Sequence, residues 1–153
     1  MKKFKFQLET LLKVTRMKKE NAEAAYAEAT RKLEDQRAHL QLLLDEMQQG
    51  QRDYEKISRE GTRIKVGRIM QFNSFFAWKR EQIEMQNNLI LQSRAEKQKK
   101  LKELMEVMRY LKSIEQLKDR KWQEYKDEMM HEEQKVLDEL GQQLVMRRKE
   151  AAS

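Results

Sequence analysis

The side chains with the greatest potential for chemistry are the only two histidines, His39 and His131. Neither has a second histidine at metal-ligand spacing, and the HEE at residues 131–133 is not the HExxH of a zinc-binding helix. Asp127, His131 and Lys135 follow one another at intervals of four and would share a helix face, where a solvated ladder of ion pairs is the ordinary expectation. We therefore predict no metal site around these histidines.

Nucleophiles, paired carboxylates and phosphate loops give no stronger signal. The sequence has no Cys, which excludes disulfides, thiolate metal ligands and a cysteine nucleophile. Glu132 and Glu133 are adjacent and point to different sides of a helix, so they make a poor carboxylate dyad. GTRIKVG at residues 61–67 lacks the Gly-Lys-Ser/Thr ending of a phosphate loop. We predict a protein without catalytic activity and without a cofactor.

The composition indicates long helices rather than a globule. Charged residues make up 39% of the 153 positions, and the mean hydropathy of −1.02 is too low for a large compact core. There is no Pro and there are only four Gly, so helix breakers are nearly absent. Disorder is the competing interpretation, but the apolar residues are periodic and the charges alternate in sign, which favours helices.

Apolar residues in both halves follow the alternating four-three spacing of a coiled-coil seam. In the first half the seam occupies positions 22, 26, 29, 33, 36, 40, 43, 47, 50, 54 and 57, where only Gln36 and Gly50 fit poorly. In the second half it occupies positions 101, 104, 108, 111, 115, 118, 122, 125 and 129. Between residues 84 and 100 the spacing is weak, so we expect looser packing there, or contact with another molecule.

The sequence therefore predicts an all-α fold in which two long helices form an antiparallel coiled-coil hairpin with a longer C-terminal helix. Gly61 and Gly67 mark the reversal of the chain, because each costs a helix about 1 kcal/mol relative to Ala. The alternative is one continuous helix that dimerises in parallel through these two glycines. We expect a single domain over residues 1–153, with a helix from about 4 to 58, a turn from about 59 to 68 and a helix from about 69 to 148.

The predicted helices end at different levels. With the turn near residue 64, Phe4 lies opposite about residue 124, so residues 125 to about 148 extend past the N-terminus. This overhang still carries an apolar stripe, made up of Tyr125, Met129, Met130, Val136, Leu137, Leu140, Leu144 and Val145. Exposed apolar surface of that extent usually marks an interaction site. The alternatives are a turn that lies further along the chain, and two molecules that cover each other's overhangs.

The net charge of +7 suits an anionic partner, but the distribution of charge argues against nucleic acid. Basic residues between positions 94 and 121 alternate with acids, and no aromatic residue between positions 79 and 109 offers a stacking surface. A solvated helix face explains these charges more simply. No run approaches the roughly 20 apolar residues of a membrane span. We expect a soluble, intracellular protein.

Three stretches resemble the FliJ family of bacterial flagellar type III export proteins. They are FKFQLETLLKVTRMKKENA at residues 4–22, FNSFFAWKREQIEMQ at 72–86 and EQKVLDEL at 133–140. Each alone is weak because coiled coils mimic one another, but their order and spacing cover nearly the whole chain. The resemblance implies a cytoplasmic coiled coil at the inner membrane beneath the flagellum, which enters the hexameric ring of the export ATPase like the central stalk of a rotary ATPase.

The resemblance also implies partners and contact residues. The residues that we expect to bind the ATPase are Phe6, Leu8, Leu11, Trp122, Tyr125, Met129, Val136 and Leu140. The residues that we expect to bind the cytoplasmic domain of the membrane export gate are Phe72, Phe75, Lys79, Gln82 and Gln86. Export chaperones are the third implied partner. Two other functions remain open at this point: a stalk protein of a virulence-type secretion system, and a coiled-coil spacer with a purely structural role.

Overall fold

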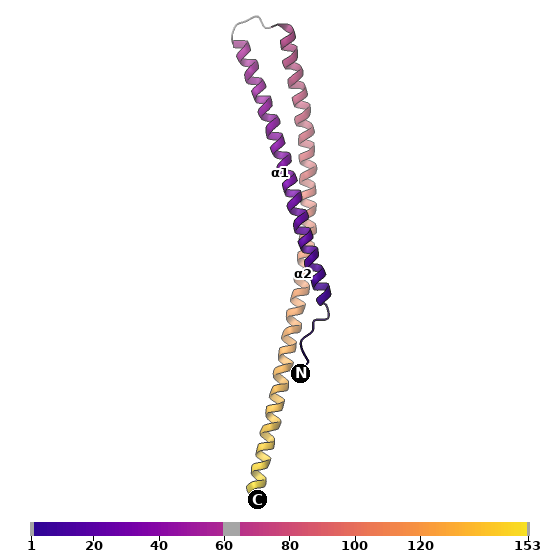
Figure 1. Cartoon of the computed structure of the whole chain (residues 1–153), viewed down its shortest axis with the longest axis vertical. Helices are drawn as coiled ribbons and strands as arrows, with labels where there is room; N and C mark the ends of the chain where they lie inside the picture. Colours follow the sequence, from indigo (N-terminus) through magenta and orange to yellow (C-terminus); the bar gives the residue numbers. More distant parts are fainter. Residues whose placement is uncertain (1, 60–64, 153) are drawn as a thin grey trace. The chain divides into compact units, whose positions relative to one another are not determined.

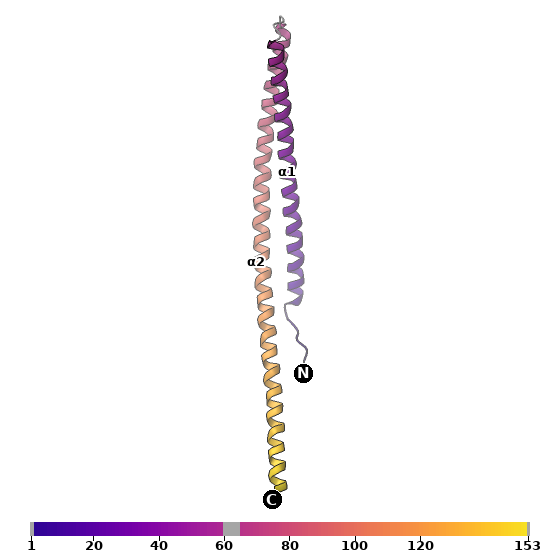
Figure 2. The same cartoon turned by 90° about the vertical axis from the view of Figure 1, so that its left-hand side faces the viewer.

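The computed structural model describes residues 2–59 and 65–152. Two helices contain almost all of them: α1, Glu9–Arg59, has 51 residues and α2, Val66–Ala152, has 87 (Figure 1). The described residues contain no strand. The two helices pack side by side and antiparallel, and α2 is the longer (Figure 2). The predicted fold class, an all-α antiparallel coiled-coil hairpin with a longer C-terminal helix, is confirmed.

The internal contacts divide the chain into two compact units. The central unit is Glu20–Glu106, and the terminal unit combines Met1–Lys19 with Val107–Ser153. Each unit contains part of α1 and part of α2, and so each has its own helix–helix seam.

The N-terminal segment, residues 2–8, precedes α1 and is not helical. The sequence predicts a helix from about residue 4, whereas α1 begins at Glu9, where the backbone N–H donates to the carbonyl of Phe6 at 3.2 Å. The reason lies in the spacing of Phe4, Phe6 and Leu8, because apolar residues at every second position suit an extended chain rather than a helix.

The reversal between the helices falls largely outside the described residues. Gly61 lies in residues 60–64, which the structure does not describe. Gly67, the second glycine expected to mark the turn, lies in the first turn of α2. That turn is closed by the backbone N–H groups of Arg68 and Ile69, which donate to the carbonyl of Lys65 at 2.9 and 3.3 Å.

The seam of the central unit follows the predicted positions of α1. Every position of the predicted set from Ala22 to Ile57 is buried or half-buried, and Leu33 and Leu43 are among the most buried residues. The two positions that fit poorly by sequence are each matched by a side chain of α2. Gln36 accepts hydrogen bonds from Gln86, and Gly50 leaves space for the ring of Phe75.

The ring of Phe75 approaches Gly50 so closely that a side chain at position 50 would obstruct it. A Cβ atom built at Gly50 would lie 2.5 Å from Cε1 of Phe75. Glycine at this position therefore has a packing reason, which offsets its cost in a helix interior. Phe75 in turn contacts Phe76, with 5.7 Å between ring centroids, and Tyr54 of α1 contacts Phe76 at 6.3 Å.

The seam of α2 continues through polar residues that the sequence pattern does not identify. Lys79, Gln86 and Ser93, spaced seven residues apart, are all buried, as is Ile90 between the last two. Residues 84–100 therefore include buried seam positions, and a cavity lined by Leu89, Gln92 and Ser93 lies beside them, so the expectation of looser packing, or of contact with another molecule, stays a prediction. The apolar spacing is weak in this stretch because seam positions carry the polar residues Gln86 and Ser93, of which Gln86 is hydrogen-bonded to Gln36 of α1.

The predicted register of α2 is also wrong by one residue in part of the terminal unit. Met108 and Glu115 were assigned to the seam, but Met108 is exposed, while Val107 is half-buried and Ile114 is buried. Glu115 lies at the edge of the seam, where it pairs with Arg16. The buried core of this unit consists of Leu12, Leu111 and Ile114, with Phe6 and Leu11 packed against it.

Leu12 is 0% exposed, so we predict that Leu12→Ala lowers the free energy of unfolding by about 2–4 kcal/mol, through lost apolar burial and the cavity left behind. The matched control is Leu137→Ala in the same unit, where the side chain is exposed and the change should stay within about 0.5 kcal/mol. Denaturant unfolding followed by circular dichroism at low protein concentration measures both. Equal losses for the two variants would contradict the assigned core.

Candidate partner-binding site

The N-terminal segment lies along α2 through an aromatic cluster. The ring of Phe4 is 5.1 Å from Trp122 and 5.6 Å from Tyr125 between centroids, and Trp122 and Tyr125 stack at 5.7 Å. The hydroxyl of Tyr125 donates to the backbone carbonyl of Lys2 at 2.7 Å. The predicted placement of Phe4 opposite about residue 124 is confirmed. These contacts hold the non-helical N-terminal segment against α2, just beyond Lys118, which pairs with the first residue of α1.

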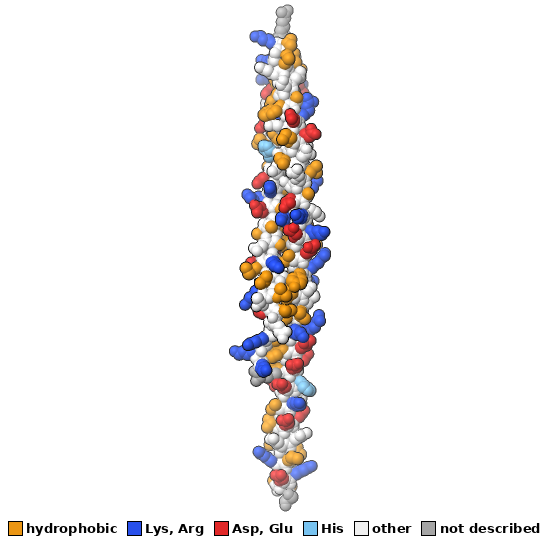
Figure 3. All heavy atoms as spheres, turned by 90° about the vertical axis from the view of Figure 1, so that its right-hand side faces the viewer, with side chains coloured by type: hydrophobic (Ala, Val, Ile, Leu, Met, Phe, Trp, Pro, Cys, Tyr) orange, Lys and Arg blue, Asp and Glu red, His pale blue; other side chains and the backbone are white. Residues whose placement is uncertain are grey.

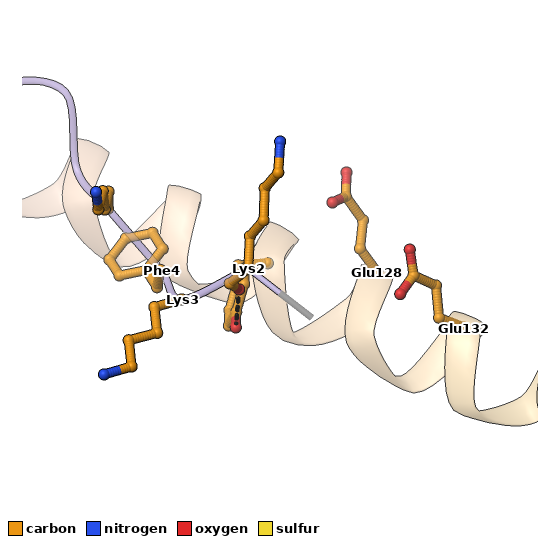
Figure 4. A pocket seen from close by; sticks show the side chains of 7 residues that line it. Lys2, Lys3, Phe4, Glu128 and Glu132 are labelled. Atoms are coloured by element: carbon orange, nitrogen blue, oxygen red, sulfur yellow. Dashed lines mark hydrogen bonds between the residues drawn. The ribbon is translucent and has the colours of Figure 1, made fainter.

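Beside this cluster is a surface hollow with opposite charges on its two walls. The N-terminal segment contributes Lys2, Lys3 and Lys5, and α2 contributes Glu128 and Glu132. In Figure 4 the side chain of Lys2 points to the same side as that of Glu128, whereas Lys3 points away. The hollow therefore presents both signs of charge next to the exposed apolar surface described below.

Ion pairs of described residues join α1 to α2 in the terminal unit, among them Glu9–Lys118 and Arg16–Glu115. Lys118 Nζ lies 2.9 Å from a carboxylate oxygen of Glu9, and Arg16 Nε lies 3.8 Å from Glu115. The hydrogen bond donated by Lys118 is the main cause that lowers the pKa of Glu9 below its ordinary value of 4.5, with smaller contributions from the charges of Lys118, Lys13 and Arg16. Glu9 also stands at the first position of α1, where a negative charge is favourable.

The C-terminal segment, residues 130–152, is exposed throughout. It nevertheless carries seven large apolar side chains, each more than half exposed: Met130, Val136, Leu137, Leu140, Leu144, Val145 and Met146. Most of them recur at intervals of three and four residues, which places them along one side of α2. Figure 3 displays apolar side chains at the surface of this segment among acidic and basic ones. Apolar surface of this extent on a helix indicates a binding face.

The residues expected to bind the ATPase fall into two groups. Phe6 and Leu11 pack against the core of the terminal unit, and Tyr125 and Met129 are half-buried. Leu8 and Trp122 are partly exposed, at 38% and 42%. Val136 and Leu140 are 55% and 51% exposed, and so they are available to a partner without any rearrangement. The structure thus separates residues that anchor the N-terminal segment from residues that can face another protein.

The residues expected to bind the export gate lie in the central unit, and most of their side chains pack in the seam between α1 and α2. Lys79 and Gln86 are each 4% exposed. Phe72, Phe75 and Gln82 are half-buried, and the Oε1 atom of Gln82 accepts no hydrogen bond from the described part of the chain. Phe72, Phe75 and Gln82 keep partly exposed surface, whereas Lys79 and Gln86 do not, although Phe75 also packs against Gly50 of α1.

Lys79 and Gln86 are held by specific partners on α1. Lys79 forms an ion pair with Glu46, and its Nζ lies 5.0 Å from the centre of the Trp78 ring and 5.7 Å from that of Phe75. The side-chain amide of Gln86 donates to the backbone carbonyl of Gln36 at 2.9 Å and to its side-chain carbonyl at 2.6 Å. Both polar groups are therefore satisfied, as buried polar groups must be.

The exposed apolar residues of the central unit that the sequence pattern did not identify include Trp78, Met85 and Leu89. Trp78, Met85 and Leu89 are 54%, 62% and 43% exposed. Their separation by seven and four residues places them on one side of α2, next to the seam positions. Their spacing is a signal in the sequence that could have identified them. It resembles the spacing of the seam residues, however, and the two sets can be told apart only when the register of α2 is known.

A two-helix antiparallel coiled coil with an exposed apolar C-terminal stripe is a protein-binding module. The family model for the flagellar FliJ protein matches residues 4–150, which is nearly the whole chain, and the chain belongs to this family. Searches of the curated proteins and of the solved structures gave no match. The FliJ family consists of non-catalytic components of the flagellar export apparatus, so this chain is a component of that apparatus with partners within it. Among the described residues, no helix has a stretch that is long and apolar enough to cross a membrane.

The lowered pKa of Glu9 predicts a dependence of stability on pH. Because the pKa is lower in the folded than in the unfolded chain, the stabilisation is present above the ordinary value of 4.5 and is lost as the pH falls through the folded-state pKa. In Glu9→Gln this part of the acid dependence should disappear. Melting temperatures of both proteins across the acid range measure the effect; parallel curves would contradict the role of the Glu9–Lys118 pair.

The ion pair in the central seam predicts a non-additive response to substitution. Glu46→Ala leaves the ammonium of Lys79 buried without its partner and should lower the free energy of unfolding by about 1–3 kcal/mol. Adding Lys79→Leu to Glu46→Ala should recover most of that loss, since an apolar side chain suits the seam. A double-mutant cycle measured by denaturant unfolding tests this. Additive losses would mean that the two side chains do not interact.

Proposed function

We propose that this protein is the stalk-like subunit of the flagellar export apparatus and inserts its C-terminal segment into the hexameric ring of the export ATPase. The observation that carries the proposal is the exposed stripe that includes Val136, Leu140 and Leu144, on a segment of α2 without a covering helix. A hexameric ring offers a central channel that encloses a single helix on all sides, and such a channel would cover an apolar face together with its charged flanks. The family membership supports a role in this apparatus.

The N-terminal segment contributes to the same end of the protein. Phe4 holds it against Trp122 and Tyr125, and its lysines stand beside the acidic residues of α2. Trp122, which is 42% exposed, offers an aromatic anchor near the start of the C-terminal segment, and such anchors contribute most to protein–protein contacts. In this proposal the apolar stripe supplies affinity, and the mixed charges of the hollow favour one orientation of the stalk.

A second contact, with the cytoplasmic domain of the export gate, belongs to the central unit. We assign it to Phe72, Phe75 and Gln82, whose side chains are half-buried. Lys79 and Gln86 support this face from within the seam by holding α2 against α1. Export chaperones are the remaining proposed partners, and the location implied by these contacts is cytoplasmic, at the inner membrane beneath the flagellum.

The ATPase contact is tested by replacing Val136 and Leu140 together with Gln, which keeps helix propensity while removing apolar surface. We expect binding to the purified export ATPase to weaken at least about tenfold, since each lost apolar contact is worth about 1 kcal/mol or more. Stimulation of ATP hydrolysis should fall in parallel. The measurement is a titration of the ATPase with each variant, followed by hydrolysis rate and by direct binding.

The matched control replaces Leu42 and Leu44 of the central unit with Gln, because these leucines are also exposed, at 54% and 41%. This variant should stimulate the ATPase as the unmodified protein does. Circular dichroism should give unchanged helicity for both variants. Unimpaired stimulation by the Val136 and Leu140 variant would refute the assignment of the stripe to the ATPase ring.

A further inference from the structure

The C-terminal segment carries charges on its apolar stripe as well as beside it. Met130, Leu137, Leu140 and Leu144 follow the three-four spacing of a seam, and Glu133 and Arg147 complete that spacing within the same stripe. All six side chains are exposed. The two charges are opposite in sign and stand at opposite ends of the stripe.

Neighbouring residues extend this polarity along the segment. Glu132 precedes Glu133 near the start of the segment, and Arg148 and Lys149 follow Arg147 near its end. A second copy that runs antiparallel and crosses near Leu140 brings the acidic end of each chain beside the basic end of the other. A parallel copy brings like charges together. The pattern therefore favours the antiparallel arrangement, in which the same face serves both chains around a two-fold axis.

Gly141 follows Leu140 near the middle of the stripe, and among the described residues it has no packing role. A Cβ atom built there meets nothing within 4 Å, so the chain itself gains no contact from the missing side chain. In an exposed helix interior glycine costs about 1 kcal/mol relative to alanine. A close approach by another helix would use the space that the glycine leaves, as Gly50 does for Phe75 in the central unit.

We propose that the C-terminal segment pairs with the same segment of a second copy of this chain, as an antiparallel two-helix coiled coil centred near Leu140 and Gly141. The pairing covers the apolar stripe and joins Glu132 and Glu133 of each chain to Arg147 and Arg148 of the other. This inference goes beyond the proposed function, because it concerns the free protein and requires no ATPase.

The experiment uses two charge-reversed forms of the full chain. One carries Glu132→Arg with Glu133→Arg, and the other carries Arg147→Glu with Arg148→Glu. Sedimentation equilibrium over a wide concentration range should find a dimer for the unmodified protein. Each reversed form alone should dimerise at least about tenfold more weakly, because it loses symmetric ion pairs and gains repulsions, each worth a few tenths of a kcal/mol or more.

An equimolar mixture of the two reversed forms should restore the dimer, since every acidic end then meets a basic one. The mixture also controls for misfolding and for effects on the nearby lysines of the N-terminal segment, because neither fault would be repaired by mixing. The proposal is overturned if the unmodified protein is monomeric at every concentration, or if the mixture dimerises no better than its components. Neither result bears on ATPase stimulation, so failure here is distinguishable from failure of the proposed function.

Discussion

In the central unit, Lys79 of α2 is buried against Glu46 of α1, and Gln86, seven residues further on, is buried against Gln36. A slip of one heptad would set Gln86 against Leu43 or Ala29 and leave its amide without a partner, at a cost of about 1–3 kcal/mol. The same slip would move Phe75 away from Gly50, where the missing side chain leaves space for its ring. Polar and steric matches, more than apolar burial, therefore select one register of the two helices.

The difference in length between the helices leaves the apolar stripe of the C-terminal segment exposed. In the terminal unit the pairing of α1 with α2 ends in the cluster of Phe4, Trp122 and Tyr125, and the remaining turns of α2 have no helix beside them. Their apolar side chains stay exposed, although burying them would be favourable. The chain belongs to a family of flagellar export components, and we propose that this face binds a partner within that machinery.

The same face suits two proposed occupants, an ATPase ring and a second copy of the chain. Both would bury Leu140 and its neighbours, so they exclude each other, and mass action decides which of them forms at given concentrations. A weak self-pairing would cover apolar surface on the free protein and yield to a ring that binds more tightly. The charges at the two ends of the stripe would then orient the two chains. Because exposed ion pairs each contribute little energy, the pair would still dissociate readily.

The sequence by itself determined the helical content and the seam of α1, because apolar spacing and the lack of helix breakers are local properties. It predicted the antiparallel pairing and the exposed C-terminal stripe while alternatives to both remained open. The position of Phe4 opposite the region of Trp122 and Tyr125 was predicted from the helix rise and a turn near residue 64, although Phe4 itself lies in the non-helical segment before α1. Only the tertiary structure decided the register of α2, the burial of Lys79 and Gln86, and the extended path of the N-terminal segment. Each of these depends on a partner far away in the sequence: Glu46 for Lys79, Gln36 for Gln86, and the aromatic pair of α2 for Phe4. A polar residue at a seam position is indistinguishable from a surface residue until the group that satisfies it is known.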